Sequence, residues 1–333
     1  MIETCTLLNF ISNGHTIIDV RSENEYLQGH IPGAINLPIL NNEVRKAVGT
    51  CYKQNGQEAA VTLGFELVGP KFSEFIKEAQ KIAHEKELNI YCWRGGMRSQ
   101  IMAWVLSLAG FKIKVLEKGY KSYRNWTVQV FESPMQIKVI GGPTGSGKTA
   151  IIQALKKSGQ PVIDLEHLAH HKGSAFGALG QLPQSTQEQF ENNFAWQLHQ
   201  MQGCVWLENE SRKIGRNVIP APVFNAMRQA PVFHINLSLE CRIERILNEY
   251  GRFETDVLAK QTTELSKRLG GLQLKNALHA LQQNDLKLWI VILLGYYDKS
   301  YLHGNLQRNS QDITVIDATQ FDDVFHQLTP YFF

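Results

Sequence analysis

Residues 136–155 read Gln136-Ile137-Lys138-Val139-Ile140-Gly141-Gly142-Pro143-Thr144-Gly145-Ser146-Gly147-Lys148-Thr149-Ala150-Ile151-Ile152-Gln153-Ala154-Leu155. The apolar run at 136–141 predicts a buried strand, and residues 150–155 continue as a helix. Between them, the spacing Gly142-x4-Gly147-Lys148-Thr149 is typical of a loop whose backbone N–H groups surround phosphate. Because strand, loop and helix follow in the required order, we expect an α/β fold here.

The loop also predicts which residues contact the phosphates. We expect Lys148 to reach the outer phosphates and Thr149 to be available to a Mg²⁺ ion. The phosphate-binding residues expected from the motif are Gly142, Thr144, Gly145, Ser146, Gly147, Lys148 and Thr149. The motif leaves the ligand open, since a diphosphate, a nucleoside triphosphate or a small phosphate ester would all fit such a loop.

A carboxylate on the metal side of the phosphates should follow on a neighbouring strand. Asp164 is one candidate, within 162–166, and Glu208 is the other, after the apolar run 204–207. Glu208 is favoured because its run predicts a buried strand more clearly. For either residue, the alternative is a solvated carboxylate at a strand end.

A cysteine lies in a second loop, Tyr91-Cys92-Trp93-Arg94-Gly95-Gly96-Met97-Arg98-Ser99. Residues 88–91 predict a strand and 100–108 a helix, so the loop connects the two. Backbone N–H groups, the helix N-terminus and the charges of Arg94 and Arg98 favour the thiolate of Cys92. Gly95 and Gly96 let the backbone wrap closely. We therefore predict a reactive cysteine, the alternative being a buried structural one.

The upstream sequence resembles the opening of a rhodanese domain. The resemblance rests on 16–26, which include Asp19-Val20-Arg21, and on Gly29-His30-Ile31-Pro32-Gly33 with the residues to 38. It implies an N-terminal rhodanese-like parallel α/β domain over 1–128, then a linker at 129–136 and a P-loop NTPase-like α/β domain over 137–333. Arg98 lies six positions after Cys92, a loop length similar to that of the phosphatase-like branch of this fold. A sulfane atom and a phosphate-type substrate both remain open for Cys92.

Composition sets limits on the class of protein. A chain of 333 residues suits two domains of ordinary size. Five cysteines without paired spacing argue against a disulfide framework and a zinc site, and favour a reducing cytoplasm. The start of the chain lacks the pattern of a signal peptide, and its most apolar run, 289–294, is too short to span a bilayer.

Positive charge is concentrated between the two loops. Residues 92–148 contain nine Lys and Arg residues against two acidic ones, whereas the whole chain has a net charge of only +3. Tyr120, Tyr123 and Trp126 alternate with these charges, a mixture suited to phosphate contact and base stacking. The alternative is a solvated basic face beside core aromatics. The candidate polynucleotide contacts are Lys118, Lys121 and Arg124.

The combination of both loops with three later segments is similar to the tRNA 2-selenouridine synthase family. The segments are 164–177, 207–215 and 296–301. The resemblance implies action on 2-thiouridine at the wobble position of the tRNAs for lysine, glutamate and glutamine. It also implies geranylation by geranyl diphosphate, then selenation by selenophosphate, with Cys92 carrying selenium. A selenophosphate synthase would supply the donor, and we expect a cytoplasmic monomer with no membrane partner. Lys172 stands where arginine is expected in many relatives.

Two other functions remain open from the residues alone. One is a rhodanese-fold cysteine phosphatase or sulfurtransferase with a nucleotide-binding domain, which the long Cys92 loop favours. The other is a non-catalytic module that binds tRNA or switches with a nucleotide. Neither alternative requires both loops together with the later segments.

Overall fold

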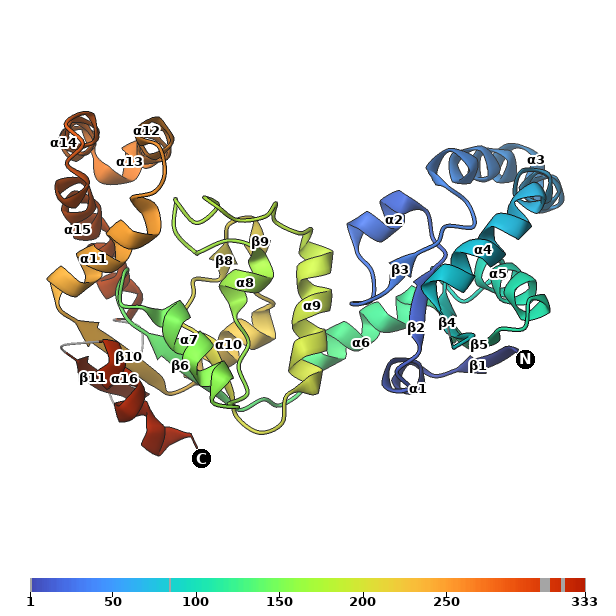
Figure 1. Cartoon of the computed structure of the whole chain (residues 1–333), viewed down its shortest axis with the longest axis horizontal. Coiled ribbons are helices and arrows are strands. Elements are labelled where there is room, and N and C mark those ends of the chain that lie inside the picture. Colours follow the sequence, from blue (N-terminus) through green and yellow to red (C-terminus); the bar gives the residue numbers. More distant parts are fainter. Residues whose placement is uncertain (1, 84, 306–311, 319–320, 333) are drawn as a thin grey trace. The chain divides into compact units, whose positions relative to one another are not determined.

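The structure is a computed structural model that describes residues 2–83, 85–305, 312–318 and 321–332 (Figure 1). Of the family segment at 296–301, the side chains of the last two residues lie outside this description. The chain divides into two compact units: unit 1 comprises Met1–Val130 with Glu191–Trp196, and unit 2 comprises Phe131–Phe190 with Gln197–Phe333.

Unit 1 is built on a parallel sheet of five strands in the order β1-β5-β4-β2-β3 (Figure 1). The strands are β1 (Ile2–Cys5), β2 (Thr16–Asp19), β3 (Ile35–Asn36), β4 (Glu87–Tyr91) and β5 (Lys112–Leu116). The helices are α1 (Leu7–Ser12), α2 (Glu23–Gln28), α3 (Asn42–Val68), η1 (Gly69–Lys71), α4 (Phe72–Ile82), α5 (Met97–Leu108) and α6 (Tyr120–Glu132).

Apolar residues cover both faces of this sheet. Ile18 and Ile90 pack with residues of α4 and α5, whereas their neighbours Ile17 and Tyr91 pack with residues of α1 and α6. Successive side chains of a strand point to opposite faces, so each strand supplies two cores. Such strands read as continuous apolar runs, as 88–91 does.

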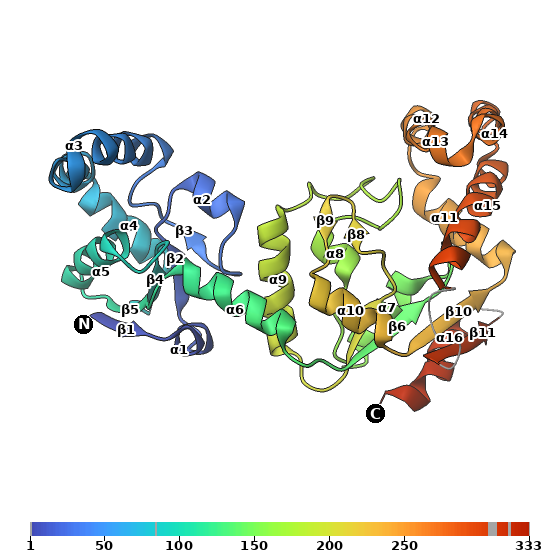
Figure 2. The same cartoon turned by 180° about the vertical axis from the view of Figure 1, so that it is seen from behind.

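Unit 2 contains a second parallel sheet, in the order β11-β10-β6-β7, with helices around it (Figure 2). Its strands are β6 (Ile137–Gly141), β7 (Val205–Glu208), β10 (Val232–Leu237) and β11 (Ile313–Ala318), and β8 (Lys213–Ile214) pairs with β9 (Asn217–Val218) as a separate antiparallel ribbon. Its helices are α7 (Lys148–Lys157), α8 (Leu165–Ala169), α10 (Ala221–Gln229), α11 (Leu239–Tyr250), α12 (Thr255–Glu264), α13 (Ser266–Leu269), α14 (Gly271–Gln282), α15 (Leu286–Asn305), α16 (Phe321–Leu328) and η3 (Thr329–Tyr331). Helix α9 (Gln187–Gln200) contributes its middle, Glu191–Trp196, to unit 1.

Unit 2 has two cores. One lies on the sheet, where Ile140, Ile152 and Trp206 pack with residues of α16. The other joins α11, α12, α14 and α15 around Trp289, and these helices gather at one end of the unit (Figure 2). The α/β class with parallel sheets that the sequence predicts is confirmed for both parts of the chain.

The junction between the two sheets along the chain is short. Helix α6 continues to Glu132 and β6 begins at Ile137, so the first residues of the predicted linker 129–136 are helical. The exact boundaries at 128 and 136 stay predictions. Within the described ranges, no helix has the length and apolar character needed to cross a membrane.

Candidate functional site

Cys92 lies where β4 ends, four residues before the cap of α5. Its side chain is 3% exposed, with Sγ 3.2 Å from Ser99 Oγ and 3.9 Å from the carbonyl oxygen of Gly96, the N-cap of α5. The predicted loop from strand to helix is therefore present. The thiol thus lies beside the N-terminus of α5.

The turn after β5 supports this loop through its backbone. Tyr120 N–H donates to the Cys92 carbonyl at 2.8 Å, and Lys121 N–H donates to the Trp93 carbonyl at 3.0 Å. Gly119 has φ +58°, and a Cβ there would lie 2.3 Å from the Cys92 carbonyl oxygen. Only glycine fits this contact. Sequence reasoning missed Gly119, because nothing in its local pattern connects it with Cys92.

The two arginines of the loop differ in their surroundings. Arg94 is exposed, whereas Arg98 donates from Nη1 to Glu25 Oε2 at 2.8 Å. Arg45 Nε lies 2.9 Å from the same Glu25 oxygen. Burial acts to raise the pKa of Glu25, but Arg98 and Arg45 outweigh it and hold that pKa below its usual value. The guanidinium of Arg98 therefore forms an ion pair with Glu25 of α2.

The aromatic residues of the basic segment are mostly core residues. Tyr120 and Tyr123 are fully buried, so the interpretation of these two as base-stacking residues is wrong. The Arg21 guanidinium lies 3.8 Å from the centre of the Tyr120 ring and forms a buried ion pair with Asp19. Trp93, next to Cys92, is 38% exposed and is the aromatic ring accessible beside the thiol.

The three candidate tRNA contacts are placed differently. Lys118 and Lys121 are exposed. Arg124 donates to Glu191 Oε2 and to Asn192 Oδ1, both at 2.5 Å. The guanidinium of Arg124 is therefore already bonded to two residues of unit 1.

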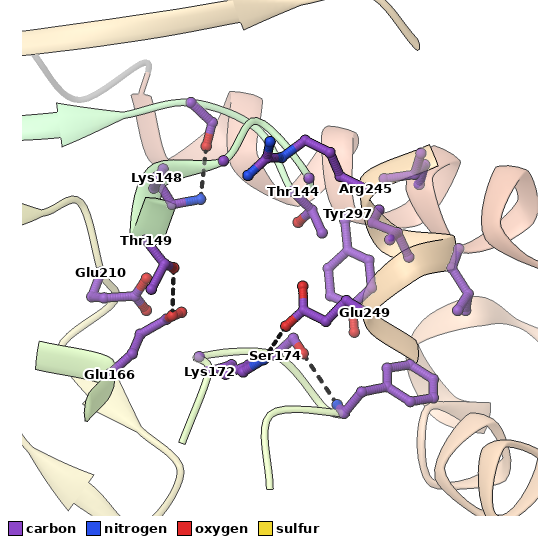
Figure 3. Close-up of a pocket in the computed structure, with 18 of the residues that line it drawn as sticks. Thr144, Lys148, Thr149, Glu166, Lys172, Ser174, Glu210, Arg245, Glu249 and Tyr297 are labelled. Atoms are coloured by element: carbon purple, nitrogen blue, oxygen red, sulfur yellow. Dashed lines mark hydrogen bonds and ion pairs between the residues drawn. The ribbon is translucent and has the colours of Figure 1, made fainter. Parts of the chain in front are cut away.

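In unit 2, the phosphate-binding loop follows β6, and α7 begins at Lys148 (Figure 3). Lys148 Nζ donates to the Gly142 carbonyl at 3.1 Å, and Thr149 Oγ1 donates to Glu166 Oε2 at 2.9 Å. Helix α11 packs directly on the loop: a Cβ on Gly145 would lie 2.9 Å from Ile246 Cδ1 and 3.1 Å from the Arg242 carbonyl oxygen. The buried hydroxyl of Ser146 has no hydrogen-bond partner among the described residues.

Four acidic residues surround the start of α7. Glu208 pairs in register with Ile140 of the adjacent β6, is completely buried, and neither of its carboxylate oxygens has a hydrogen-bond partner in the described structure. Asp164 instead caps α8, accepting from His167 N–H at 2.8 Å and from Gln153 at 2.6 Å. Both carboxylate oxygens of Asp164 therefore already accept hydrogen bonds from nearby residues.

Glu166 and Glu210 were not singled out as acids from the sequence, yet both line the cavity beside the loop. Burial and the nearby Glu210 raise the pKa of Glu166 to about 8. Burial likewise raises the pKa of Glu210, and burial with Glu166 raises that of Glu208 well above its usual value. The site thus concentrates carboxyl groups whose ionised forms are disfavoured. The described side chains include no group of three His, Cys, Asp or Glu residues arranged to hold a metal ion by themselves.

The cavity has a volume of about 990 Å³, and its lining includes two chemically different groups of residues, called here the charged wall and the apolar wall. The loop, Lys172 and three arginines form the charged wall, and Lys172 makes an ion pair with Glu249. The arginines are Arg212, Arg228 and Arg245. The apolar wall is formed by Phe176, Ile246, Trp289, Ile290, Leu293 and Leu294.

A buried arginine links the phosphate-binding loop to α15. Arg242 donates from Nε to the Thr144 carbonyl at 2.8 Å and from Nη2 to Asp298 Oδ1 at 2.6 Å. Thr144 belongs to the loop and Asp298 to α15. The position of α15 is thereby coupled to the phosphate-binding backbone.

Comparison with known proteins identifies both parts of the chain. Residues 6–125 match the rhodanese-like domain family, and residues 135–329 match the family described as the tRNA 2-selenouridine synthase AAA domain. A tRNA 2-selenouridine synthase from Bdellovibrio bacteriovorus is 36% identical, the match covering 97% of each chain. One from Cronobacter sakazakii is 38% identical over 92% of this chain and 91% of its own. The resemblance seen in the sequence is confirmed, and the chain belongs to the tRNA 2-selenouridine synthase family.

Proposed function

We propose that this protein converts 2-thiouridine at the wobble position of tRNA into 2-selenouridine in two steps. The sulfur is first alkylated by geranyl diphosphate, and selenium from selenophosphate then replaces the S-geranyl group. Family membership supports the overall conversion. The division of labour between the Cys92 loop and the phosphate-binding loop is our assignment.

The cavity of unit 2 is the observation that carries the geranyl step. One wall offers backbone N–H groups and Lys148 for a diphosphate, and the other offers aliphatic and aromatic side chains for an apolar tail. An ordinary phosphate site has no need of such an apolar wall. Geranyl diphosphate joins both chemistries in one molecule, so its two parts match the two walls.

In the first step, the thiouridine sulfur attacks the first carbon of the geranyl chain, and the bond from that carbon to the diphosphate oxygen breaks. Negative charge grows on the departing diphosphate. Lys148 and the backbone N–H groups at the start of α7 would stabilise that charge. The base releases its ring N–H proton to water, and its sulfur becomes part of a better leaving group.

A Mg²⁺ ion fits the residues beside the loop. Thr149 and Glu166 would hold it on the protein side, with diphosphate oxygens and water completing the shell, as Mg²⁺ prefers. The ion would supply charge neutralisation to the diphosphate. A cation bound there would also favour the ionised form of the neighbouring Glu208, whose two carboxyl oxygens have no hydrogen-bond partner in the described structure.

In the second step, selenophosphate is assigned to the Cys92 loop: its selenium attacks C2 of the base, the C2–S bond breaks and geranylthiol leaves, and water then breaks the Se–P bond to release phosphate and leave 2-selenouridine. The Cys92 loop supports this assignment because it combines a helix N-terminus with Arg94 and Arg98. Trp93 adds an exposed ring on which a base can stack. Lys118 and Lys121 remain proposed tRNA contacts; the engaged Arg124 is assigned to supporting α6.

On this proposal, the substrates are the tRNAs for lysine, glutamate and glutamine, and a selenophosphate synthase supplies the selenium donor. We further propose that the protein acts as a cytoplasmic monomer. These assignments follow from the family resemblance.

The identity of the diphosphate ligand can be tested by competition. A fluorescent diphosphate probe bound to the protein should be displaced by geranyl diphosphate much more strongly than by ATP. Lys148→Ala should weaken binding of the probe by about 10-fold or more, whereas Lys156→Ala, an exposed lysine on the same helix, should not. Tight ATP binding that geranyl diphosphate fails to compete with would contradict the proposal.

A further inference from the structure

The lining residues that α15 contributes to the cavity follow one another along the helix from Trp289 to Tyr297. Tyr297 is followed by Asp298, and Arg242 links Asp298 to the phosphate-binding loop. Thr144 and Tyr297 are on the same side of the cavity in Figure 3. Trp289 is eight residues earlier, about 12 Å along the axis at about 1.5 Å per residue. Leu294, Leu293 and Ile290 line the cavity between them.

Trp289 is fixed more firmly than an ordinary cavity residue. It is 1% exposed, and its indole N–H donates to Thr262 Oγ1 at 3.1 Å. Its ring meets Phe176 edge to face, with centroids 5.4 Å apart and planes at 86°. Both rings line the cavity. The indole is therefore fixed by a hydrogen bond to α12 and by an edge-to-face contact with Phe176.

We infer that Trp289, braced by Phe176, closes the apolar end of the cavity and limits the prenyl chain to two isoprene units. The inference rests on the proposed function and adds its specificity determinant. With carbon–carbon bonds of about 1.5 Å, an extended geranyl chain reaches roughly 10 Å from its diphosphate oxygen, and a third isoprene unit brings this to roughly 15 Å. The rise of about 12 Å along α15 between Tyr297 and Trp289 lies between these two lengths.

The test is a comparison of prenyl donors of five, ten and fifteen carbons. We would measure kcat/KM for S-prenylation of 2-thiouridine in tRNA with the wild type, Trp289→Leu and Phe176→Leu. Leu281→Ala is the matched control, because Leu281 is buried in the same helical core but does not line the cavity. Thermal unfolding and binding of inorganic diphosphate report whether each variant keeps its fold and its phosphate site.

Trp289→Leu should raise the ratio of fifteen-carbon to ten-carbon kcat/KM by about 10-fold or more, since small changes in an apolar pocket shift specificity by about that factor. Phe176→Leu should raise it in the same direction and serves as the second measurement if Trp289→Leu is unfolded. Leu281→Ala should keep the wild-type ratio. A wild-type ratio in both folded pocket variants, or an equal rise in Leu281→Ala, overturns the inference alone. A wild type that uses none of the three donors overturns the proposed function and the inference with it.

Discussion

The backbone of the Cys92 loop packs directly against a single residue, Gly119. In Gly119→Ala, the new Cβ would meet the Cys92 carbonyl oxygen at 2.3 Å and the Gly95 nitrogen at 2.5 Å. We expect selenation to fall by about 10-fold or more, as misplacement of a reactive group by about 1 Å can cost 100-fold. S-geranylation should persist. The measurement is the yield of each modified nucleoside from tRNA incubated with both co-substrates.

The matched control for that substitution is Gly64→Ala, where the added Cβ has no neighbour within 4 Å. Equal loss of selenation in both variants would show that the effect is not local. Full selenation by Gly119→Ala would contradict the supporting role of the turn after β5.

Glu208 gives a residue-scale prediction about pH. Burial and the neighbouring Glu166 raise its pKa well above the usual 4.5, so the folded protein retains a proton that the unfolded chain releases. The stability of unit 2 should therefore fall as pH rises above about 4.5. Glu208→Gln resembles the protonated form, so its thermal unfolding temperature should depend less on pH between about 5 and 8 and exceed that of the wild type at the upper end.

The exposed Glu264 supplies the control, since Glu264→Gln should keep the wild-type pH dependence. An unfolding temperature for Glu208→Gln that follows the wild type at every pH would exclude Glu208 as a source of this dependence.

At the scale of elements, the contact between the phosphate-binding loop and α11 determines whether the loop keeps its shape. Gly145→Ala would place Cβ 2.9 Å from Ile246 and 3.1 Å from the Arg242 carbonyl, at φ +82°. We expect the affinity for inorganic diphosphate, measured by calorimetry, to fall by about 10-fold or more. Gly159→Ala has a similar φ of +83° but open space around it, so it isolates the steric contact. The prediction fails if both variants bind diphosphate equally well.

The elements that carry local motifs were predictable from the sequence. The runs at 88–91 and 136–141 are strands, and the two loops connect strands to helices as their glycine, cysteine and lysine spacing indicates. The placement of Glu208 beside β6 also follows from its apolar run. In each case the signal is contained within about ten consecutive residues.

Features made by distant residues were not predictable. The apolar wall joins Phe176 to α15, and Gly119 meets Cys92 through backbone contact. Tyr120 and Tyr123 alternate with lysines in the sequence, yet α6 buries both rings against the sheet of unit 1. Glu166 follows the capping residue Asp164 by two positions, and the local sequence does not distinguish the cap from the cavity acid.

For the whole molecule, the central claim is that its two units carry separate steps of one reaction. Each unit has its own sheet, its own core and its own loop from a strand to a helix, to which we assign anion binding. Cys92→Ala should therefore block selenation and spare geranylation. Lys148→Ala should block geranylation and, with it, the selenation that depends on geranylated tRNA.

The most direct test is mass spectrometry of nucleosides from 2-thiouridine-containing tRNA incubated with geranyl diphosphate and selenophosphate. The wild type should yield 2-selenouridine, Cys92→Ala should accumulate S-geranyl-2-thiouridine, and Lys148→Ala should leave 2-thiouridine unchanged. Supplying Lys148→Ala with tRNA that is already geranylated should restore 2-selenouridine. Formation of 2-selenouridine by the wild type without geranyl diphosphate, or failure of pre-geranylated tRNA to rescue a folded Lys148→Ala, would contradict the two-step account.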